Sequence, residues 1–213
     1  MPARLFLLKK AQIIRSLRFF FISLSAFYLN ACTGTPDNIQ AITHFSMDDY
    51  LGSWYEVARL DHGFERGLEQ VSATYSVRED GGIRVLNRGY DAEERAWQQA
   101  EGRAYLMAEN NIGHLKVSFF GPFYGSYIIF ELGHDVPSQL EKTLTEASPI
   151  TTIELNQADD EHAYAFVSGH NTDYLWLLAR HPQVSDQLKQ HFIEQANRLG
   201  FASDELIWVK QKP

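Results

Sequence analysis

Eight short stretches between residues 52 and 180 are rich in Tyr, Phe, Ile and Val, and hydrophobic and polar positions alternate in them, most cleanly over residues 71–77, which predicts β-strands. Turn-forming residues such as Asp80-Gly81-Gly82 separate neighbouring stretches. Short strands at nearly regular spacing, joined by turns, favour an all-β barrel or sandwich. The predicted strands cover residues 52–60, 71–77, 83–90, 98–106, 115–120, 127–132, 162–168 and 174–180.

Two other segments have helical patterns. Residues 185–199 place apolar side chains on one stripe, and Gly200 supplies the stop signal. A shorter helical turn is expected just before residue 52, with Ser46 as its cap. A last strand is expected over residues 206–209. The apolar stripe of residues 185–199 predicts that this long helix packs outside the strands. The stripe consists of Leu188, Phe192, Ala196 and Leu199.

The first 31 residues have the organisation of a bacterial signal peptide. Five basic residues and no acidic ones accompany an apolar run over 19–29, which is too short to span a membrane. The run ends at Leu29-Asn30-Ala31-Cys32, which resembles the lipobox of bacterial lipoproteins. In such proteins the cysteine becomes the acylated N-terminus. The alternative is an ordinary secretory signal followed by an incidental free thiol.

The lipobox resemblance implies an anchored protein. Cys32 is the only cysteine of the chain, so an internal disulfide is excluded, and stable anchoring needs more than one acyl chain. Thr33 stands where an Asp would signal retention in the inner membrane, which implies the periplasmic face of the outer membrane. We expect residues 32–44 to form a lipidated tether, which is polar and flexible near Gly34 and Pro36.

Charge argues against nucleic acid as a partner. The whole chain has a formal charge of −8, and without the five basic residues before Cys32 it has 14 basic and 27 acidic residues, or −13. An acidic domain repels nucleic acid and anionic membrane surfaces. The oligomeric state is not fixed by the sequence, and a homodimer stays open.

A Gly-x-Trp element, Gly52-Ser53-Trp54, begins the first predicted strand and is followed far along the chain by Thr172-Asp173-Tyr174 and Arg180. These pieces, in this order, resemble the lipocalin family, and in particular the bacterial lipoprotein lipocalins and apolipoprotein D. The resemblance implies an eight-stranded antiparallel up-and-down barrel over residues 45–213. It also implies that Trp54 plugs the closed end, that Arg180 lies across it, and that Gly52 allows close packing there.

One segment departs from the family pattern. Residues 133–158 stand where a short hairpin is expected between the sixth and seventh strands. Leu140, Leu144 and Ala147 have helical spacing within it. Up-and-down alternation places this insert at the closed end, beside the anchored N-terminus. We interpret it as a decorated hairpin, with a partner-docking or membrane-contacting element as the alternative. Residues 61–70 are expected to form a loop, and the resemblance to lipocalins implies that this loop acts as a lid over the mouth.

Alternation along each strand predicts the residues that face the interior. On the first strand Trp54, Glu56 and Ala58 share one face, and Tyr55, Val57 and Arg59 share the other. An eight-stranded barrel can hold one small ligand, and small residues on the fourth strand leave room for it. The predicted ligand contacts are Glu56, Ala73, Tyr75, Val85, Asn87, Gly102, Ala104, Val117, Phe119, Tyr127, Ile129, Trp176 and Leu178.

Motifs of catalysis are missing from the sequence. It has no Gly-x-Ser-x-Gly elbow, no phosphate loop and no His-Glu-x-x-His, and we expect no catalytic residues, no metal and no cofactor. Residues 159–162, Asp-Asp-Glu-His, are interpreted as a solvated turn.

The leading hypothesis is a membrane-anchored protein that stores or carries a single-chain lipid, and the family resemblance implies a fatty acid or lysophospholipid. Two alternatives remain open. One is a lipid-modifying enzyme on the same scaffold, with Glu56 as its titratable group. The other is a structural envelope protein with a filled barrel and a partner-docking insert.

Overall fold

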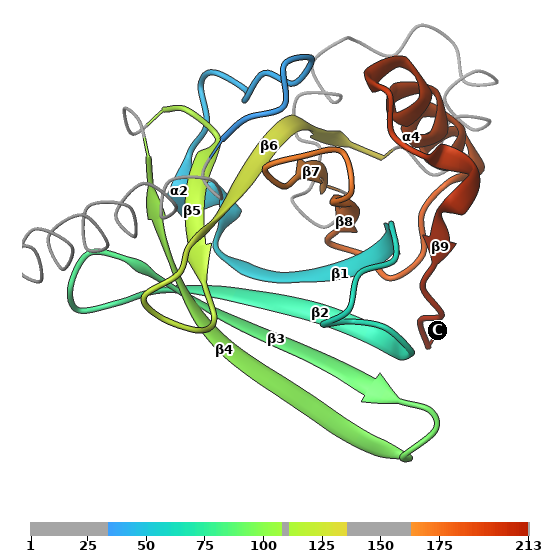
Figure 1. The fold of residues 1–213 in the computed structure, drawn as a ribbon, viewed down its shortest axis with the longest axis horizontal. Helices are drawn as coiled ribbons and strands as arrows, with labels where there is room; N and C mark the ends of the chain where they lie inside the picture. The colour runs from blue at the N-terminus through green and yellow to red at the C-terminus, as the bar shows by residue number, and fades with distance from the viewer. Residues whose placement is uncertain (1–33, 108–110, 136–162, 213) are drawn as a thin grey trace, which may run out of the picture. The chain divides into compact units, whose positions relative to one another are not determined.

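The computed structural model describes residues 34–107, 111–135 and 163–212 (Figure 1). The expected signal peptide, Cys32 and most of the insert over 133–158 lie outside these residues, as does the turn over 159–162. Eight antiparallel strands, β1 to β8, each pair with their neighbours in the chain, and the pairing of β1 with both β2 and β8 closes the barrel. This confirms the all-β fold predicted from the strand pattern and the eight-stranded up-and-down barrel implied by the family resemblance.

The strand bounds differ from the predicted ones by a few residues. The largest change is in β2, which begins at Leu68 because its first residues pair with the end of β3. A ninth strand, β9 (Ile207–Trp208), pairs with β1 from outside the barrel. The barrel strands are β1 (Gly52–Arg59), β2 (Leu68–Val77), β3 (Ile83–Asp91), β4 (Ala96–Leu106), β5 (His114–Ser118), β6 (Gly125–His134), β7 (Ala163–Ser168) and β8 (Leu175–Ala179).

The helices begin and end at the residues that their capping signals indicate. In α2 (Met47–Tyr50) the Ser46 side chain accepts a hydrogen bond from the Asp49 backbone N–H. Ser185 caps α4 (Asp186–Leu199) in the same way, and Gly200 ends it in the left-handed conformation at φ 84°. A single 3₁₀ turn, η4 (Ser203–Glu205), leads into β9. Within the described ranges, none of the helices combines the length and apolar character of a membrane span.

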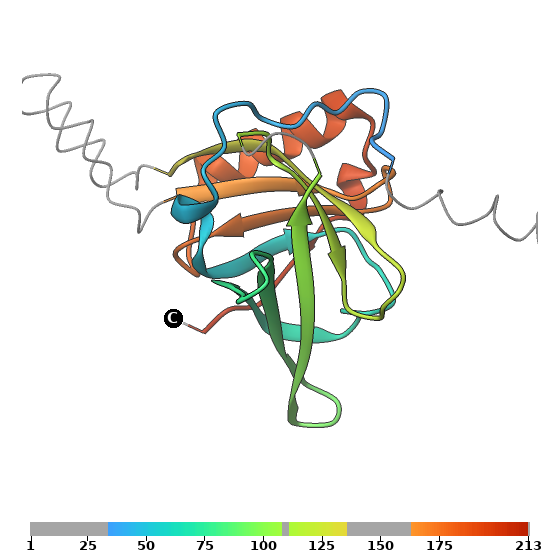
Figure 2. The same cartoon turned by 90° about the vertical axis from the view of Figure 1, so that its left-hand side faces the viewer.

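Two apolar clusters lie on opposite sides of the barrel wall. Outside, Phe192 of α4 packs against Phe166 of β7, with ring centroids 4.8 Å apart, and α4 covers this side of the barrel (Figure 2). Inside, side chains from β1 to β8 surround the barrel axis. The apolar stripe of α4 thus serves the outer cluster, as its spacing predicts, and leaves the interior to the strands.

Up-and-down connectivity gives the barrel two distinct ends. We call the end that holds Trp54 and Arg180 the closed end, and the opposite end, with loops 60–67, 119–124 and 169–174, the open end. The β6–β7 connection begins and ends at the closed end, where His134 pairs with Ala163. The insert is therefore attached at the end that the alternation predicts.

A β-bulge in β1 changes which residues face inward. The register with β8 shifts between Glu56 and Ala58, so that Ala58 pairs with Leu177 of the outer cluster and Arg59 pairs with Trp176. The prediction that Ala58 shares the face of Trp54 and Glu56 is wrong, because the extra residue reverses the alternation. Arg59 takes its place in the interior and is 1% exposed.

The N-terminal segment also differs from the expected flexible tether. Ile39 is 3% exposed and joins the outer cluster, and Ile42 exchanges backbone hydrogen bonds with Ile129 and Gly113. The described part of the segment, from Gly34 onward, therefore packs along the barrel wall. Buried apolar area and backbone pairing offset the entropy that a polar, Gly- and Pro-containing segment loses on ordering.

Candidate functional site

The closed end of the barrel is built around Trp54. Its indole N–H donates to the Tyr50 carbonyl over 2.9 Å, and the Arg180 guanidinium lies 4.0 Å from the centre of the indole ring. Arg180 donates hydrogen bonds to the carbonyls of Asp49, Leu51 and Ser53. These contacts hold α2 against the barrel and close its base.

Gly52 makes this arrangement possible. It has φ 96°, and a Cβ at this position would lie 3.2 Å from Arg180 Nη1. A larger residue would therefore strain the backbone and crowd the guanidinium that covers Trp54.

Three phenols form a layer above the base. Tyr127 is hydrogen-bonded to Tyr50 at 2.7 Å and to Tyr75 at 2.8 Å between the hydroxyl oxygens. Burial is the main cause that raises the pKa of all three phenols, so they stay protonated at neutral pH. Each of the three hydroxyl oxygens therefore has a hydrogen-bond partner within the layer.

One wall of the interior is apolar and made of small residues. It comes from β2 to β5, where Ala73 and Val85 face inward beside Gly102, Ala104 and Val117. Ile129 of β6 and Leu178 of β8 continue the apolar surface, and both are buried.

Phe119 lies directly against Gly102. A Cβ on Gly102 would be 2.9 Å from the Phe119 ring and 2.9 Å from the Ser118 carbonyl oxygen. Glycine at this position therefore allows the phenyl ring to pack across β4. This wall contains most of the ligand contacts expected from the sequence.

The opposite wall carries a buried charge cluster. Arg59 Nη1 donates to Glu56 Oε1 over 2.6 Å, and Arg59 Nη2 donates to the carbonyl of Glu65 over 2.8 Å. Glu56 is 3% exposed and Glu65 6% exposed, so one guanidinium faces two carboxyl groups away from water. Burial, and then the charge of Glu65, raises the pKa of Glu56 well above its ordinary value. Burial also raises the pKa of Glu65.

The loop between β1 and β2 covers the mouth. Its Glu65 side chain reaches Trp176, whose indole N–H donates to Oε2 over 3.2 Å. His62 stacks between Phe64 and Tyr174, with ring centroids 4.1 and 5.8 Å away. Burial, and then the Arg59 charge, lowers the pKa of His62 to about 4, so the ring is neutral at neutral pH. The loop expected as a lid therefore lies over the open end and is fixed by Arg59 and Trp176.

Several polar atoms of this cluster have no hydrogen-bond partner among the described residues. They are Arg59 Nε and both ring nitrogens of His62, and a further such atom, Asn87 Oδ1, lies outside the cluster; each is buried from solvent. Asn87 lies on β3, opposite Ala73. Buried polar atoms are normally satisfied, so such atoms indicate a place where water or a polar ligand group belongs.

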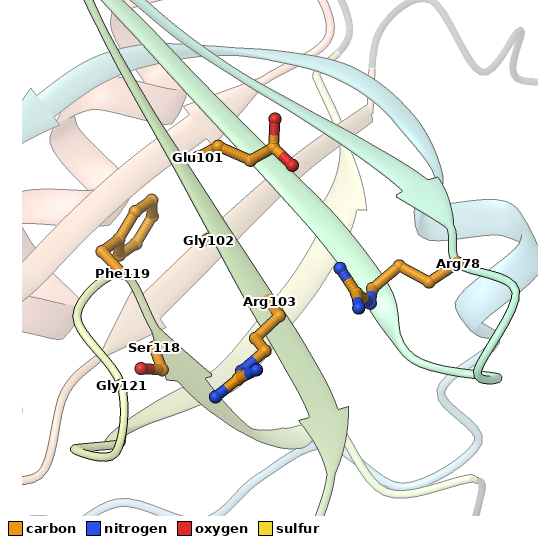
Figure 3. A pocket seen from close by; sticks show the side chains of 7 residues that line it. All are labelled: Arg78, Glu101, Gly102, Arg103, Ser118, Phe119 and Gly121. Atoms are coloured by element: carbon orange, nitrogen blue, oxygen red, sulfur yellow. The ribbon is translucent and has the colours of Figure 1, made fainter.

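A hollow of about 240 Å³ lies along β4 and shares Gly102 and Phe119 with the apolar wall (Figure 3). Two of its charged residues are already engaged in ion pairs, Arg78 with Asp80 at 3.0 Å and Glu101 with Arg84 at 2.6 Å. We therefore assign no ligand to this hollow. It is lined by Arg78, Glu101, Gly102, Arg103, Ser118, Phe119 and Gly121.

Reasoning from the sequence missed part of this site. Arg59 was placed on the outer face because a bulge has no clear signal in the alternation. Glu65 and His62 belong to a loop whose path depends on tertiary contacts. Tyr50 was assigned to the helical turn and its ring was not expected inside the barrel. The one available signal was the short spacing of Glu56, Arg59 and Glu65, three charges beside an apolar strand.

Comparison with known proteins agrees with this geometry. The family model of a lipocalin-like domain matches residues 45–140 and 149–211. The chain is 46% identical to the outer membrane lipoprotein Blc of Vibrio cholerae over 196 aligned residues. This alignment covers 92% of this chain and all of the relative. It is 42% identical to the protein of the same name from Escherichia coli K12, over 88% of this chain and 92% of the relative. These names agree with the predicted outer-membrane location.

More distant relatives share the architecture. Rat apolipoprotein D is 28% identical, covering 75% of this chain and 71% of the relative. Among solved structures, the cockroach allergen Per a 4 superposes with a TM-score of 0.55 at 16% identity, covering 84% of this chain and 96% of that one. Lobster apocrustacyanin A1 gives a TM-score of 0.53 at 14% identity, covering 84% and 93%. The matched family model, the bacterial relatives and the closed barrel together show that this chain belongs to the lipocalin family.

Proposed function

We propose that this protein is a membrane-anchored lipocalin that binds a single-chain lipid, a fatty acid or a lysophospholipid, in its barrel and stores or carries it in the bacterial envelope. The observation that carries the proposal is the two-sided interior. An apolar wall of small residues faces a buried polar cluster whose Arg59 and His62 have unpartnered atoms within the described chain, and Asn87 of β3 adds a third such atom. An amphiphile matches both sides, because its tail covers the apolar wall and its polar end meets the cluster.

The apolar wall can supply useful affinity. Burying a methylene group contributes roughly 0.8 kcal/mol, so a sixteen-carbon chain contributes on the order of ten kcal/mol before the entropic cost of binding. Micromolar affinity, or somewhat tighter, is the expected result. The lid loop must move for such a chain to enter, and this requires the Trp176–Glu65 contact to open.

The anchor belongs to the same proposal. A signal peptide over residues 1–31 is removed, Cys32 is acylated, and residues 32–44 connect the anchor to a lipocalin domain over 45–213. The names of the bacterial relatives as outer membrane lipoproteins support this assignment. Mass spectrometry of the membrane fraction would detect the acyl mass on an N-terminal peptide, and Cys32→Ser would release the protein from the membrane.

Glu56 is the group that an enzymatic function would use. Its raised pKa comes from burial beside Glu65, and Arg59 holds it in an ion pair. A buried ion cluster of this kind accounts for the shift, so we propose binding without catalysis. Turnover of lysophospholipid that Glu56→Gln abolishes would contradict this choice.

Native mass spectrometry of the Cys32→Ser mature chain, purified from cells, tests the binding proposal. We expect one fatty acid or lysophospholipid per barrel, or binding of one added lysophospholipid by an empty barrel. Ala73→Trp should block uptake because its ring fills the interior, whereas Ser72→Trp, on the opposite face of the same strand, should bind normally. An empty protein that ignores both lipids would favour the alternative of a structural envelope lipoprotein with a filled barrel.

A further inference from the structure

The described chain begins at the open end of the barrel. Ser126 Oγ, near the start of β6, donates a hydrogen bond to the carbonyl of Gly34 over 2.8 Å. From there the segment follows β6 toward the closed end, where Ile42 pairs with Ile129 (Figure 2). Gly34 therefore lies beside the β5–β6 loop, at the opposite end from the insert. Gly34, the first described residue, therefore does not lie beside the described ends of the insert, whereas the expected neighbourhood of insert and anchor concerns residues outside the described ones.

The short covalent connection limits how far Cys32, the expected anchor, can lie from Gly34. Cys32 precedes Gly34 by two residues, and two residues of fully extended chain span about 7 Å. Whatever conformation the intervening peptide adopts, acyl chains on Cys32 start close to the open end. The length of the barrel cannot be spanned by so short a connection.

The same end exposes aromatic side chains. Phe120 and Phe123 of the β5–β6 loop are 78% and 65% exposed, and Phe64 of the β1–β2 loop is 58% exposed. In the closed strand order these two loops lie on opposite sides of the same open end, and exposed phenylalanines around one end are typical of a surface that contacts a partner or a membrane. The closed end also exposes apolar side chains, Val77 at 64% and Met107 at 41%, but these are aliphatic, and the turn over residues 78–82 next to Val77 carries the Arg78–Asp80 ion pair.

We propose that the open mouth faces the bilayer, seated on the lipid surface by the phenyl rings of Phe64, Phe120 and Phe123 and by the acyl anchor on Cys32. This inference rests on the proposed function, because that proposal supplies the anchor. A lipid can then pass between bilayer and barrel through the lid without crossing bulk water. The acidic domain is repelled by anionic surfaces, so the contact is apolar and suits zwitterionic lipid.

Fluorescence quenching tests the orientation, because Cys32 is the only native cysteine. A probe is attached to Gly63→Cys on the β1–β2 loop or to Glu79→Cys at the closed end, both exposed positions. A Cβ at Gly63 meets no atom within 4 Å, so the substitution leaves the loop undisturbed. Protein acylated at Cys32 is reconstituted into phosphatidylcholine–phosphatidylethanolamine vesicles that contain a spin-labelled lipid. We expect strong quenching at position 63 and little at position 79, and the reverse order, or equal quenching, would overturn the proposal.

The Cys32→Ser form separates the aromatic surface from the anchor. We expect it to bind the same vesicles weakly, with little dependence on salt, and to lose at least about tenfold in partitioning when Phe120→Ser and Phe123→Ser remove two phenyl rings. The matched control, Val77→Ser with Met107→Ser, alters exposed apolar residues at the closed end and should change partitioning less than about twofold. Equal losses in both variants would refute the seating.

Other measurements detect a failure of the proposed function independently of the orientation test. Mass spectrometry reports whether Cys32 is acylated, and titration with lysophospholipid in solution reports whether the barrel binds lipid. The quenching experiment can also be repeated with the same two probe positions on the Cys32→Ser form, and its outcome depends on neither result. A protein that is not acylated, or that binds no lipid, still shows which end meets the vesicle.

Discussion

The charge cluster beneath the lid gives the sharpest prediction, through replacement of Arg59 by methionine. The guanidinium is 1% exposed, lies 2.6 Å from Glu56, and donates to the Glu65 and Leu68 carbonyls. Methionine keeps much of the volume and removes the charge. Because the variant leaves two buried carboxyl groups without their counter-ion, we expect a loss of about 3–5 kcal/mol in the free energy of unfolding at pH 8.

The loss should depend on pH with a definite sign. Arg59 lowers the pKa of both Glu56 and Glu65, so its removal raises both values further in the folded state. A carboxyl whose folded pKa is raised contributes stability that is fully present below its unfolded pKa and is lost as the pH rises through the folded pKa. The penalty of Arg59→Met should therefore be smallest near pH 4.5 and grow toward pH 8. At the acidic limit about 1–3 kcal/mol should remain, from the lost hydrogen bonds.

Urea unfolding of the Cys32→Ser mature chain, followed by tryptophan fluorescence at several pH values, measures this difference. Arg84→Met is the matched control, because Arg84 and Glu101 also lie 2.6 Å apart but are 41% and 53% exposed. An exposed pair of this kind contributes about 0–1 kcal/mol. If Arg59→Met lost less than about 1 kcal/mol at pH 8, or lost the same amount as Arg84→Met, the account of a buried, coupled cluster would be refuted.

Three further predictions concern the base, the outer helix and the apolar wall. Trp54→Ala should lower the free energy of unfolding by about 3–5 kcal/mol, because it opens a cavity under Arg180, and urea unfolding would measure it. Gly200→Ala should lower it by about 1 kcal/mol, since the residue has φ 84°, and a neutral result in the same assay would contradict the capping role. Gly102→Val should cost about 1–3 kcal/mol and displace the Phe119 ring, which NMR would detect as shifted ring resonances, whereas unchanged resonances would contradict the close contact.

The segments predicted most completely from the sequence are those whose local residue pattern agrees with the contacts that they make in the folded protein. The stripe of α4 buries Phe192 and Leu199 against the barrel, and Ser185 and Gly200 bound the helix through local hydrogen bonds and backbone conformation. Asp80-Gly81-Gly82 likewise forms the β2–β3 turn, with Gly81 at φ 78°. In each case the determining contacts lie within a few residues of one another, so the sequence carries the information directly.

The position of the charge cluster, by contrast, could not be predicted from the local sequence pattern. Arg59 enters the interior because β1 accommodates an extra residue against β8, and the register of a distant strand decides this shift. Glu65 reaches Trp176 across 111 positions of sequence. Long-range pairings of this kind produce no periodic pattern of hydrophobic and polar residues in the sequence. The sequence pattern therefore did not indicate that Arg59 of β1 and Glu65 of the following loop would meet Glu56 in the interior.

Hydrophobic period and capping, which are local properties, determined the strands, the outer helix and the inward-facing apolar residues, and the family resemblance added the strand order and the packing of Arg180 over Trp54. Only the tertiary structure decided that Arg59 faces inward, that Glu65 and His62 of the lid loop meet Trp176 and Tyr174, and that Gly34 docks on Ser126. Each of these depends on contacts between segments far apart in the chain. Their energies come from burial and hydrogen bonding that exist only once the barrel has closed.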